Sequence, residues 1–205
     1  MIQVKQILHC LEQAAPYELA EHWDNVGLLV GDPEARVEGV LCALDITETV
    51  VEEAAERGCN VIVAHHPVIF TSVSRVTADT VTGRIVISMI QKGISGICMH
   101  TNMDCAAAGV NDLLAASLGL TDVVNMGAGE GGNLGRVGNL PRPMTLEQFA
   151  QHVKLSLDAG GVRVADGGKM VQRVAVGGGA CGKMMDEAVA KGADTFVIGD
   201  CSYDI

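Results

Sequence analysis

Two adjacent histidines, His65 and His66, are the residues of this chain best suited to chemistry. They come directly after a run of small and β-branched apolar residues at positions 61–64 and precede Pro67. Such a run predicts a buried strand, and proline, which lacks a backbone N–H, favours its end. Ligands of open α/β sheets bind beyond the carboxyl ends of the strands, so the two imidazoles are candidate metal ligands. The alternative is structural: one imidazole hydrogen-bonds within the core and the other faces solvent.

A second apolar run, at positions 96–99, leads into His100 and, four residues later, Asp104. If the two strands are neighbours, Asp104 lies beside the histidine pair and completes the candidate metal ligands. Imidazole and carboxylate ligands suit Zn, Mn, Fe or Co better than Ca or Cu(I). Successive side chains of an extended strand point in opposite directions, so we expect His65 and His66 to bind one metal of a pair each.

Further polar residues lie near predicted strand ends. Trp23, Asp24 and Asn25 precede a short apolar strand, and Asp45 ends the strand at positions 39–44. Trp23 is expected to cover the edge of a core, while Asp24 and Asn25 either face a site or hold a turn through side-chain-to-backbone bonds. Asn25 and Asp45 are the candidate substrate-binding residues. The glycines at positions 177–182 either cradle a phosphate at a helix N-terminus or allow close packing of a turn.

Composition narrows the class of protein. The 205 residues are 48% hydrophobic but only 3% aromatic, which suits helices packed on parallel sheets. A net charge of −11 argues against nucleic-acid binding, which relies on Lys and Arg. The seven cysteines include no C-x-x-C pair, and no apolar stretch has membrane-spanning length. We therefore expect reduced thiols, no membrane partner, no signal peptide and a cytoplasmic location.

The order of elements predicts an α/β fold in two lobes. An amphipathic helix at 2–14 comes first, and a strand–helix–strand unit at 39–64 comes next, its helix capped by Thr47 or by Thr49 with Glu52. The Gly-rich stretch 125–138 is interpreted as the boundary between lobes 1–124 and 125–205. The remaining predictions are strands at 26–30, 96–99, 162–164, 171–176 and 195–198, and helices at 84–92, 109–118, 183–191 and after Thr145.

The two lobes share an internal repeat. Aligning Gly58 with Gly192, an offset of 134 residues (192 − 58), matches Glu53 with Glu187 without gaps. His66 then corresponds to Asp200, so each copy ends in a residue able to bind a metal. The repeat predicts one strand–helix–strand unit in each lobe.

Four motifs, in this order along the chain, resemble those of the type 2 GTP cyclohydrolase I homologues, also called the Nif-three-like proteins. They are Trp23-Asp24-Asn25-Val26-Gly27-Leu28-Leu29-Val30-Gly31, Ala64-His65-His66-Pro67, His100-Thr101-Asn102-Met103-Asp104 and Val174-Ala175-Val176-Gly177-Gly178-Gly179. The resemblance runs over essentially the whole chain. It implies two related α/β lobes with mainly parallel sheets around a central cleft, a dinuclear metal site and a ring-like homohexamer.

The resemblance also assigns residues. The paired histidines of the family correspond to His65 and His66, and its strand-end carboxylate corresponds to Asp104. Its remaining ligands, a His and a bridging Glu, come after one more strand, so we expect the second lobe to be truncated before them. A complete site implies a hydrolase that uses two divalent ions on a small heterocyclic or nucleotide-like substrate, with His100 as acid/base or as a hydrogen-bonding partner in a turn. The alternative is a non-enzymatic, oligomeric metal-handling or protein-interaction protein.

Overall fold

The computed structural model describes residues 1–127, 134–203 and 205, and it divides the chain into two compact units, Met1–Met103 and Asp104–Ile205. The division falls earlier than the predicted boundary at 124/125. The reason is that residues 104–125 pack with the later part of the chain: the strand at 121–125 pairs with the next strand of the second unit. The rest of the expected Gly-rich boundary includes residues 128–133, which lie outside the described residues.

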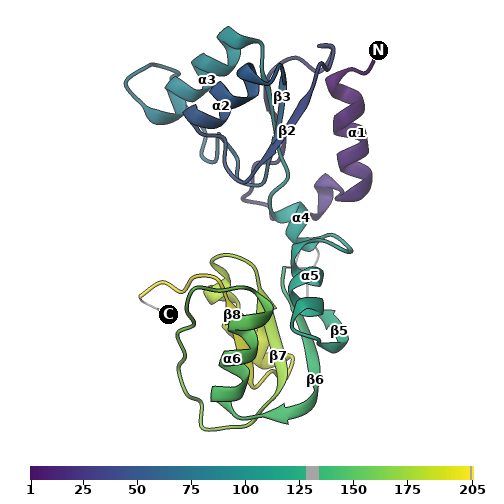
Figure 1. Cartoon of the computed structure of the whole chain (residues 1–205), viewed down its shortest axis with the longest axis vertical. Helices are drawn as coiled ribbons and strands as arrows, with labels where there is room; N and C mark the ends of the chain where they lie inside the picture. Colours follow the sequence, from purple (N-terminus) through teal and green to yellow (C-terminus); the bar gives the residue numbers. More distant parts are fainter. Residues whose placement is uncertain (128–133, 204) are drawn as a thin grey trace. The chain divides into compact units, whose positions relative to one another are not determined.

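The first unit is a four-stranded sheet between helical layers (Figure 1). Its strands are β1 (Gly27–Val30), β2 (Val40–Ala43), β3 (Val61–Ala64) and β4 (Ser95–Cys98), in the order β1-β4-β3-β2. β2, β3 and β4 run parallel, and β1 is antiparallel to β4. The sheet is therefore mainly parallel, as predicted, and β3 with its histidines occupies an interior position.

Helices cover both faces of this sheet because successive residues of β3 point to opposite sides. Ile62 and Ala64 pack with α2 (Glu48–Glu56) and α3 (Val81–Lys92), whereas Val61 packs with α1 (Val4–Ala14). Figure 1 shows α2 and α3 on one side of the strands and α1 on the other. The near-continuous apolar sequence of β3 is explained by this burial on both faces.

The second unit contains a second four-stranded sheet, in the order β5-β6-β7-β8, with one parallel pair, β7–β8, and two antiparallel pairs. The α/β class is confirmed, but this sheet is less parallel than the first. Its apolar core places α5 and α6 against β6 and β7. The elements of the second unit are α5 (Val110–Ser117), β5 (Thr121–Asn125), β6 (Arg136–Met144), α6 (Leu146–Ser156), β7 (Val171–Gly177), η2 (Cys181–Met184), α7 (Met185–Ala190) and β8 (Thr195–Ile198). The division between the units falls within α4 (Thr101–Cys105). The short helix η1 (Tyr17–Leu19) belongs to the first unit.

Several local predictions are wrong. Residues 162–164 form no strand, whereas 121–125 and 136–144 do. β6 escaped notice because Pro141 and Pro143 are unfavourable in strands, and the ladder tolerates them where its register shifts between Asn139 and Met144. The chain after β4 also turns into α4 instead of continuing as an extended strand end. Asp104 therefore lies on a helix.

The internal repeat is present in the strand register. Val40 pairs with Val61 in the first unit, and Val174 pairs with Thr195 in the second, which are the positions related by the offset found in the sequence. All four pairs of β2–β3 have such a counterpart in β7–β8, down to Ala43↔Ala64 and Gly177↔Ile198. The strand–helix–strand unit is thus repeated in structure as well as in sequence.

Among the described residues, no helix is long and apolar enough to span a bilayer.

Candidate metal centre

Three histidines converge at one edge of the first sheet. β3 ends at Ala64, directly before His65 and His66, and β4 ends at Cys98, two residues before His100. Because β3 and β4 are parallel neighbours, their carboxyl ends reach the same edge. The backbone continues the ladder briefly, since the His66 N–H donates to the Leu44 carbonyl at 2.9 Å and the Met99 N–H to the Ala64 carbonyl at 2.9 Å. This pairing fixes where the imidazoles begin.

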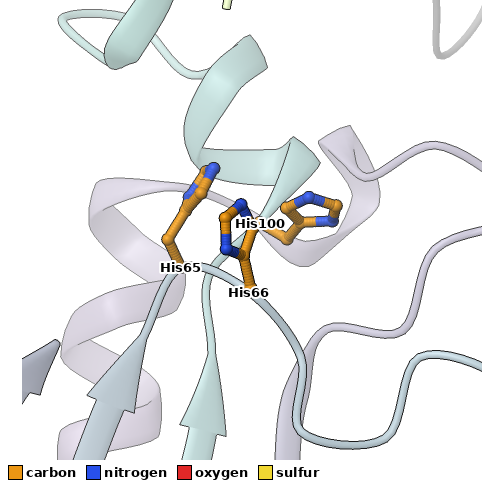
Figure 2. A group of neighbouring side chains, drawn as sticks. All are labelled: His65, His66 and His100. Atoms are coloured by element: carbon orange, nitrogen blue, oxygen red, sulfur yellow. The ribbon is translucent and has the colours of Figure 1, made fainter. Parts of the chain in front are cut away.

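The three rings are close enough to bind one ion. The ring centroid of His65 lies 5.0 Å from the centroid of His66 and 5.0 Å from that of His100. The centroids of His66 and His100 are 5.6 Å apart. One candidate ligand nitrogen from each ring lies within 4.8 Å of the others. Nitrogens bound at about 2.0–2.1 Å to one Zn lie about 3–4 Å apart, so small side-chain adjustments suffice. Figure 2 shows the three side chains gathered beyond the strands.

The expectation that His65 and His66 diverge is therefore wrong. It assumed an extended backbone, but the strand stops at Ala64 and both histidines lie in a bend. Their ring planes are tilted by 52° at a centroid distance of 5.0 Å. Both imidazoles can thus serve the same ion.

Each imidazole is oriented through its Nδ1 atom. Nδ1 of His65 lies 2.9 Å from the Met99 carbonyl oxygen, Nδ1 of His66 lies 2.8 Å from a carboxylate oxygen of Asp45, and Nδ1 of His100 lies 2.9 Å from one of Asp24. Carbonyl and ionised carboxylate oxygens only accept hydrogen bonds, which assigns the ring hydrogen to Nδ1. In the neutral ring, Nε2 is then the nitrogen with a lone pair, the usual condition of a metal-binding histidine.

Asp24 holds His100 from a fully buried position. Its side chain is 0% exposed, and its second oxygen accepts from the Thr101 N–H at 3.0 Å and the Thr101 hydroxyl at 2.5 Å. Burial by itself raises the pKa of Asp24. Hydrogen bonds from the Thr101 hydroxyl, His100 and the N–H groups of Thr101 and Asn25 outweigh it and lower that pKa below its ordinary value. Asp24 is therefore an anion at neutral pH.

From the sequence, Asp24 was expected either to face a site or to hold a turn, and it was not named as a partner of His100. It lies 76 residues from His100, so no local spacing connects the two side chains. The available signal was that a carboxylate stands next to the strand β1, which neighbours β4 in the sheet.

The other predicted site residues have distinct surroundings. Asp45 hydrogen-bonds His66, and Asn25 donates through Nδ2 to the Ile69 carbonyl at 2.6 Å. His100, predicted as a catalytic group, belongs to the three-histidine group itself. Asp104 is a buried residue of α4 whose carbonyl accepts from Asn111. The substrate-binding roles of Asn25 and Asp45 and the ligand role of Asp104 remain predictions.

The glycine turn after β7 is built for close packing. A Cβ added to Gly177 would lie 2.6 Å from Cβ of Cys181, so a side chain does not fit there. The Gly178 N–H donates to Oδ1 of Asn111 at 2.8 Å, which uses one of the backbone donors that a phosphate would need. These contacts favour the packing interpretation of the turn over a phosphate cradle.

A nearby thiol does not join the donor set. Cys98 is buried and donates from Sγ to the His65 carbonyl at 3.1 Å. Burial, with a smaller effect of the Asp24 charge, raises the pKa of Cys98 to about 12. Metals bind the thiolate, so a thiol that stays protonated is a poor ligand. Three imidazole nitrogens remain, which fit Zn, Mn, Fe or Co.

A cavity of about 870 Å³ lies elsewhere, in the second unit, between α6, the segment 159–169 and β8. Its walls are mostly apolar and contain none of the three histidines. The chemistry of the donor atoms, and not the size of the hollow, therefore identifies the site.

Known proteins resemble this chain over nearly its whole length. The family model described as Duf34/NIF3 (NGG1p interacting factor 3) matches residues 2–205. A "GTP cyclohydrolase 1 type 2 homolog" of Clostridium acetobutylicum is 37% identical over 207 residues, covering 98% of this chain and 77% of that protein.

Solved structures agree with the sequence comparison. Staphylococcus aureus protein SA1388 matches with a TM-score of 0.88 and 32% identity, over 99% of this chain and 81% of the other. A Bacillus cereus protein related to NIF3 matches with a TM-score of 0.89 and 29% identity, over 99% of this chain and 84% of the other. Because the family model matches residues 2–205 and these relatives match at least 98% of this chain, the chain belongs to the Duf34/NIF3 family.

Proposed function

We propose that the chain binds a divalent metal ion through His65, His66 and His100 and acts as a metal-dependent hydrolase. The observation that carries the proposal is the convergence of three imidazoles whose Nδ1 atoms all face acceptors. Three imidazole nitrogens with a fixed orientation form a ligand set that leaves further coordination positions of the ion open. Open positions distinguish catalytic from purely structural sites.

The residues around the three histidines have different roles. Asp24, Asp45 and the Met99 carbonyl hold the rings in register, so that little rotational freedom is lost when an ion binds. The His66 side chain is 47% exposed, which gives a small molecule access to this side of the group. A divalent ion held here would supply Lewis-acid activation of water and of a polar substrate bond.

Finer parts of the proposal rest on the resemblance. We propose a second ion with Asp104 among its ligands, and a homohexamer. The cytoplasmic location that we also propose is supported instead by the seven cysteines, which include no C-x-x-C pair. The relatives are named for a GTP cyclohydrolase homologue. That name supports a nucleotide-like or heterocyclic substrate for this chain.

Metal analysis of the purified chain tests the binding step. We expect at least about one equivalent of Zn or Mn per chain in the wild type and a large loss in His65→Ala, His66→Ala and His100→Ala. His9→Ala is the matched control, because His9 is an exposed histidine of the same unit that bonds only Gln13 in the described structure. Equal metal content in all three variants and in the control would disprove the site.

Turnover assays test the reaction. The wild type, supplied with Mn or Zn, is incubated with nucleotides and heterocyclic amides, and product is measured by chromatography. We expect metal-dependent hydrolysis of at least one compound, lost in His65→Ala and retained in His9→Ala. Stoichiometric transfer of metal to an acceptor with no turnover would instead favour the metal-handling alternative, to which the exposure of His66 lends itself.

A further inference from the structure

Two half-exposed aromatic side chains border the three histidines. Trp23 and Phe70 are each 50% exposed, and their ring centroids lie 6.0 Å apart in an edge-to-face arrangement. The His100 ring is 6.4 Å from Trp23 and 6.2 Å from Phe70. An exposed aromatic surface formed by Trp23 and Phe70 therefore lies directly beside the three histidines.

This placement is unusual for the chain. It has one Trp and three Phe, and 3% of its residues are aromatic. Of the other phenylalanines, Phe149 is buried in a core and Phe196 packs against one. Exposing a Trp or Phe forfeits the burial energy that large aromatic rings otherwise contribute to folding. A core-covering role for Trp23, as the sequence suggested, would bury far more of its ring.

Both aromatic residues are held by buried or half-buried hydrogen bonds. Trp23 precedes Asp24, whose carboxylate is fixed by His100 and Thr101. Phe70 comes directly after Ile69, whose carbonyl accepts from Asn25 Nδ2 at 2.6 Å. The loops before β1 and after β3 are thereby tied to each other and to the histidines. The backbone segments that carry the two rings are thereby held in place, as expected of groups that recognise a ligand.

We propose that Trp23 and Phe70 recognise a planar heteroaromatic ring of the substrate and hold it beside the histidines. This inference rests on the proposed function and specifies its substrate class. Edge-to-face contact leaves ring surface open for stacking. Stacking a nucleobase on an aromatic side chain is sequence-tolerant, because every base presents a π-face. A ribose ring presents no π-face for stacking, so recognition is expected to depend mainly on the base.

The sole Trp makes the test direct, since all tryptophan fluorescence comes from Trp23. Guanosine, adenosine and ribose are titrated into the full chain, once with EDTA and once with Zn. We expect saturable quenching by a nucleoside and none by ribose. Phe70→Leu, which keeps the bulk and loses the ring, should weaken nucleoside binding by about fivefold to a hundredfold.

Ile90→Ala is the matched control, because Ile90 is an exposed apolar residue of α3 in the same unit. It should bind the nucleoside as the wild type does. The urea midpoint of each variant shows whether a loss of binding reflects a loss of folding. Trp23→Leu removes the probe, so its nucleoside affinity is measured by calorimetry and is expected to fall as in Phe70→Leu.

The outcomes separate the two proposals. Absence of nucleoside binding in a wild type that binds Zn would overturn the aromatic recognition and leave the metal site standing. Nucleoside binding with EDTA, in a chain that fails to bind Zn, would support the aromatic recognition alone. If Phe70→Leu changes the mass of the particle in light scattering while no nucleoside quenches Trp23, the aromatic pair is a contact between copies and the inference is wrong.

Discussion

The Asp24 carboxylate joins the loop before β1 to the start of α4. One oxygen accepts from His100 Nδ1, and the other accepts from the hydroxyl and the N–H of Thr101. Because these donors lower its pKa, the carboxylate is ionised at neutral pH and its bond to the imidazole is charge-assisted. Asp24 is thus the residue that fixes the tautomer and direction of His100.

Replacing Asp24 with Asn tests this role. An amide loses the charge, and its NH2 group cannot accept the Nδ1 hydrogen, so we expect Zn affinity to fall by about 10–100-fold. Competition with a chromophoric chelator measures the affinity. Nitrogen-15 chemical shifts of His100 report whether the hydrogen has left Nδ1, which a merely structural defect would not change.

Asp32→Asn serves as the control, because Asp32 is an exposed carboxylate of the same unit that accepts from the Glu34 N–H. Its Zn affinity should equal that of the wild type. A folded Asp24→Asn protein with wild-type Zn affinity would show that Asp45 and Met99 suffice to orient the site.

At the scale of elements, the helix α2 supports β3 from one face. Val51 and Ala54 of α2 pack with Ile62 and Ala64 in the same core cluster. The first residue outside the helix, Thr47, accepts the Val50 N–H at 3.2 Å through its hydroxyl. Of the two caps that the sequence allowed, the structure uses Thr47.

Thr47→Ala should therefore destabilise the protein by about 1 kcal/mol, because the Val50 N–H loses its acceptor. The free energy of unfolding from urea titration measures the change. Thr49→Ala is the control: Thr49 lies inside the first turn, and its replacement by a better helix former is expected to cost nothing or to stabilise slightly. A larger loss for Thr49→Ala than for Thr47→Ala would contradict the observed cap.

At the scale of the whole molecule, the two units have separate apolar core clusters. Among the described residues, Met1–Met103 holds two clusters made of its own residues and Asp104–Ile205 holds two others. Trp23 lies in the first unit and Phe149 in a core cluster of the second. The two units are therefore expected to lose their structure independently.

Phe149→Ala tests this independence. Emptying a buried phenylalanine site costs about 3–5 kcal/mol, and we expect the cost to fall on the second unit alone. Circular dichroism, which reports helices of both units, should then show an early transition. The fluorescence transition of Trp23 should stay at its wild-type urea concentration; a shift to lower urea would show that the two units unfold together. Ile62→Ala, in a core cluster of the first unit, should move the fluorescence transition.

The sequence by itself determined the features that depend on local pattern. It predicted β3 and the histidine pair at its end, the helices α1, α2, α3, α5 and α6 to within a few residues, and the repeated unit. These predictions succeeded because apolar periodicity, caps and glycines act within a few residues of one another. The family motifs lie in the same local stretches, and the family assignment is confirmed by the comparisons.

Only the tertiary structure decided how the site is put together. It ended β3 before His65, so that the two rings converge, and it brought Asp24 to His100 across 76 residues of chain. It also paired β6 with β7 despite the two prolines in β6, and it left Trp23 half exposed. These features depend on which strands become neighbours in the sheet, and that choice is made by the packing of whole elements rather than by the residues on either side.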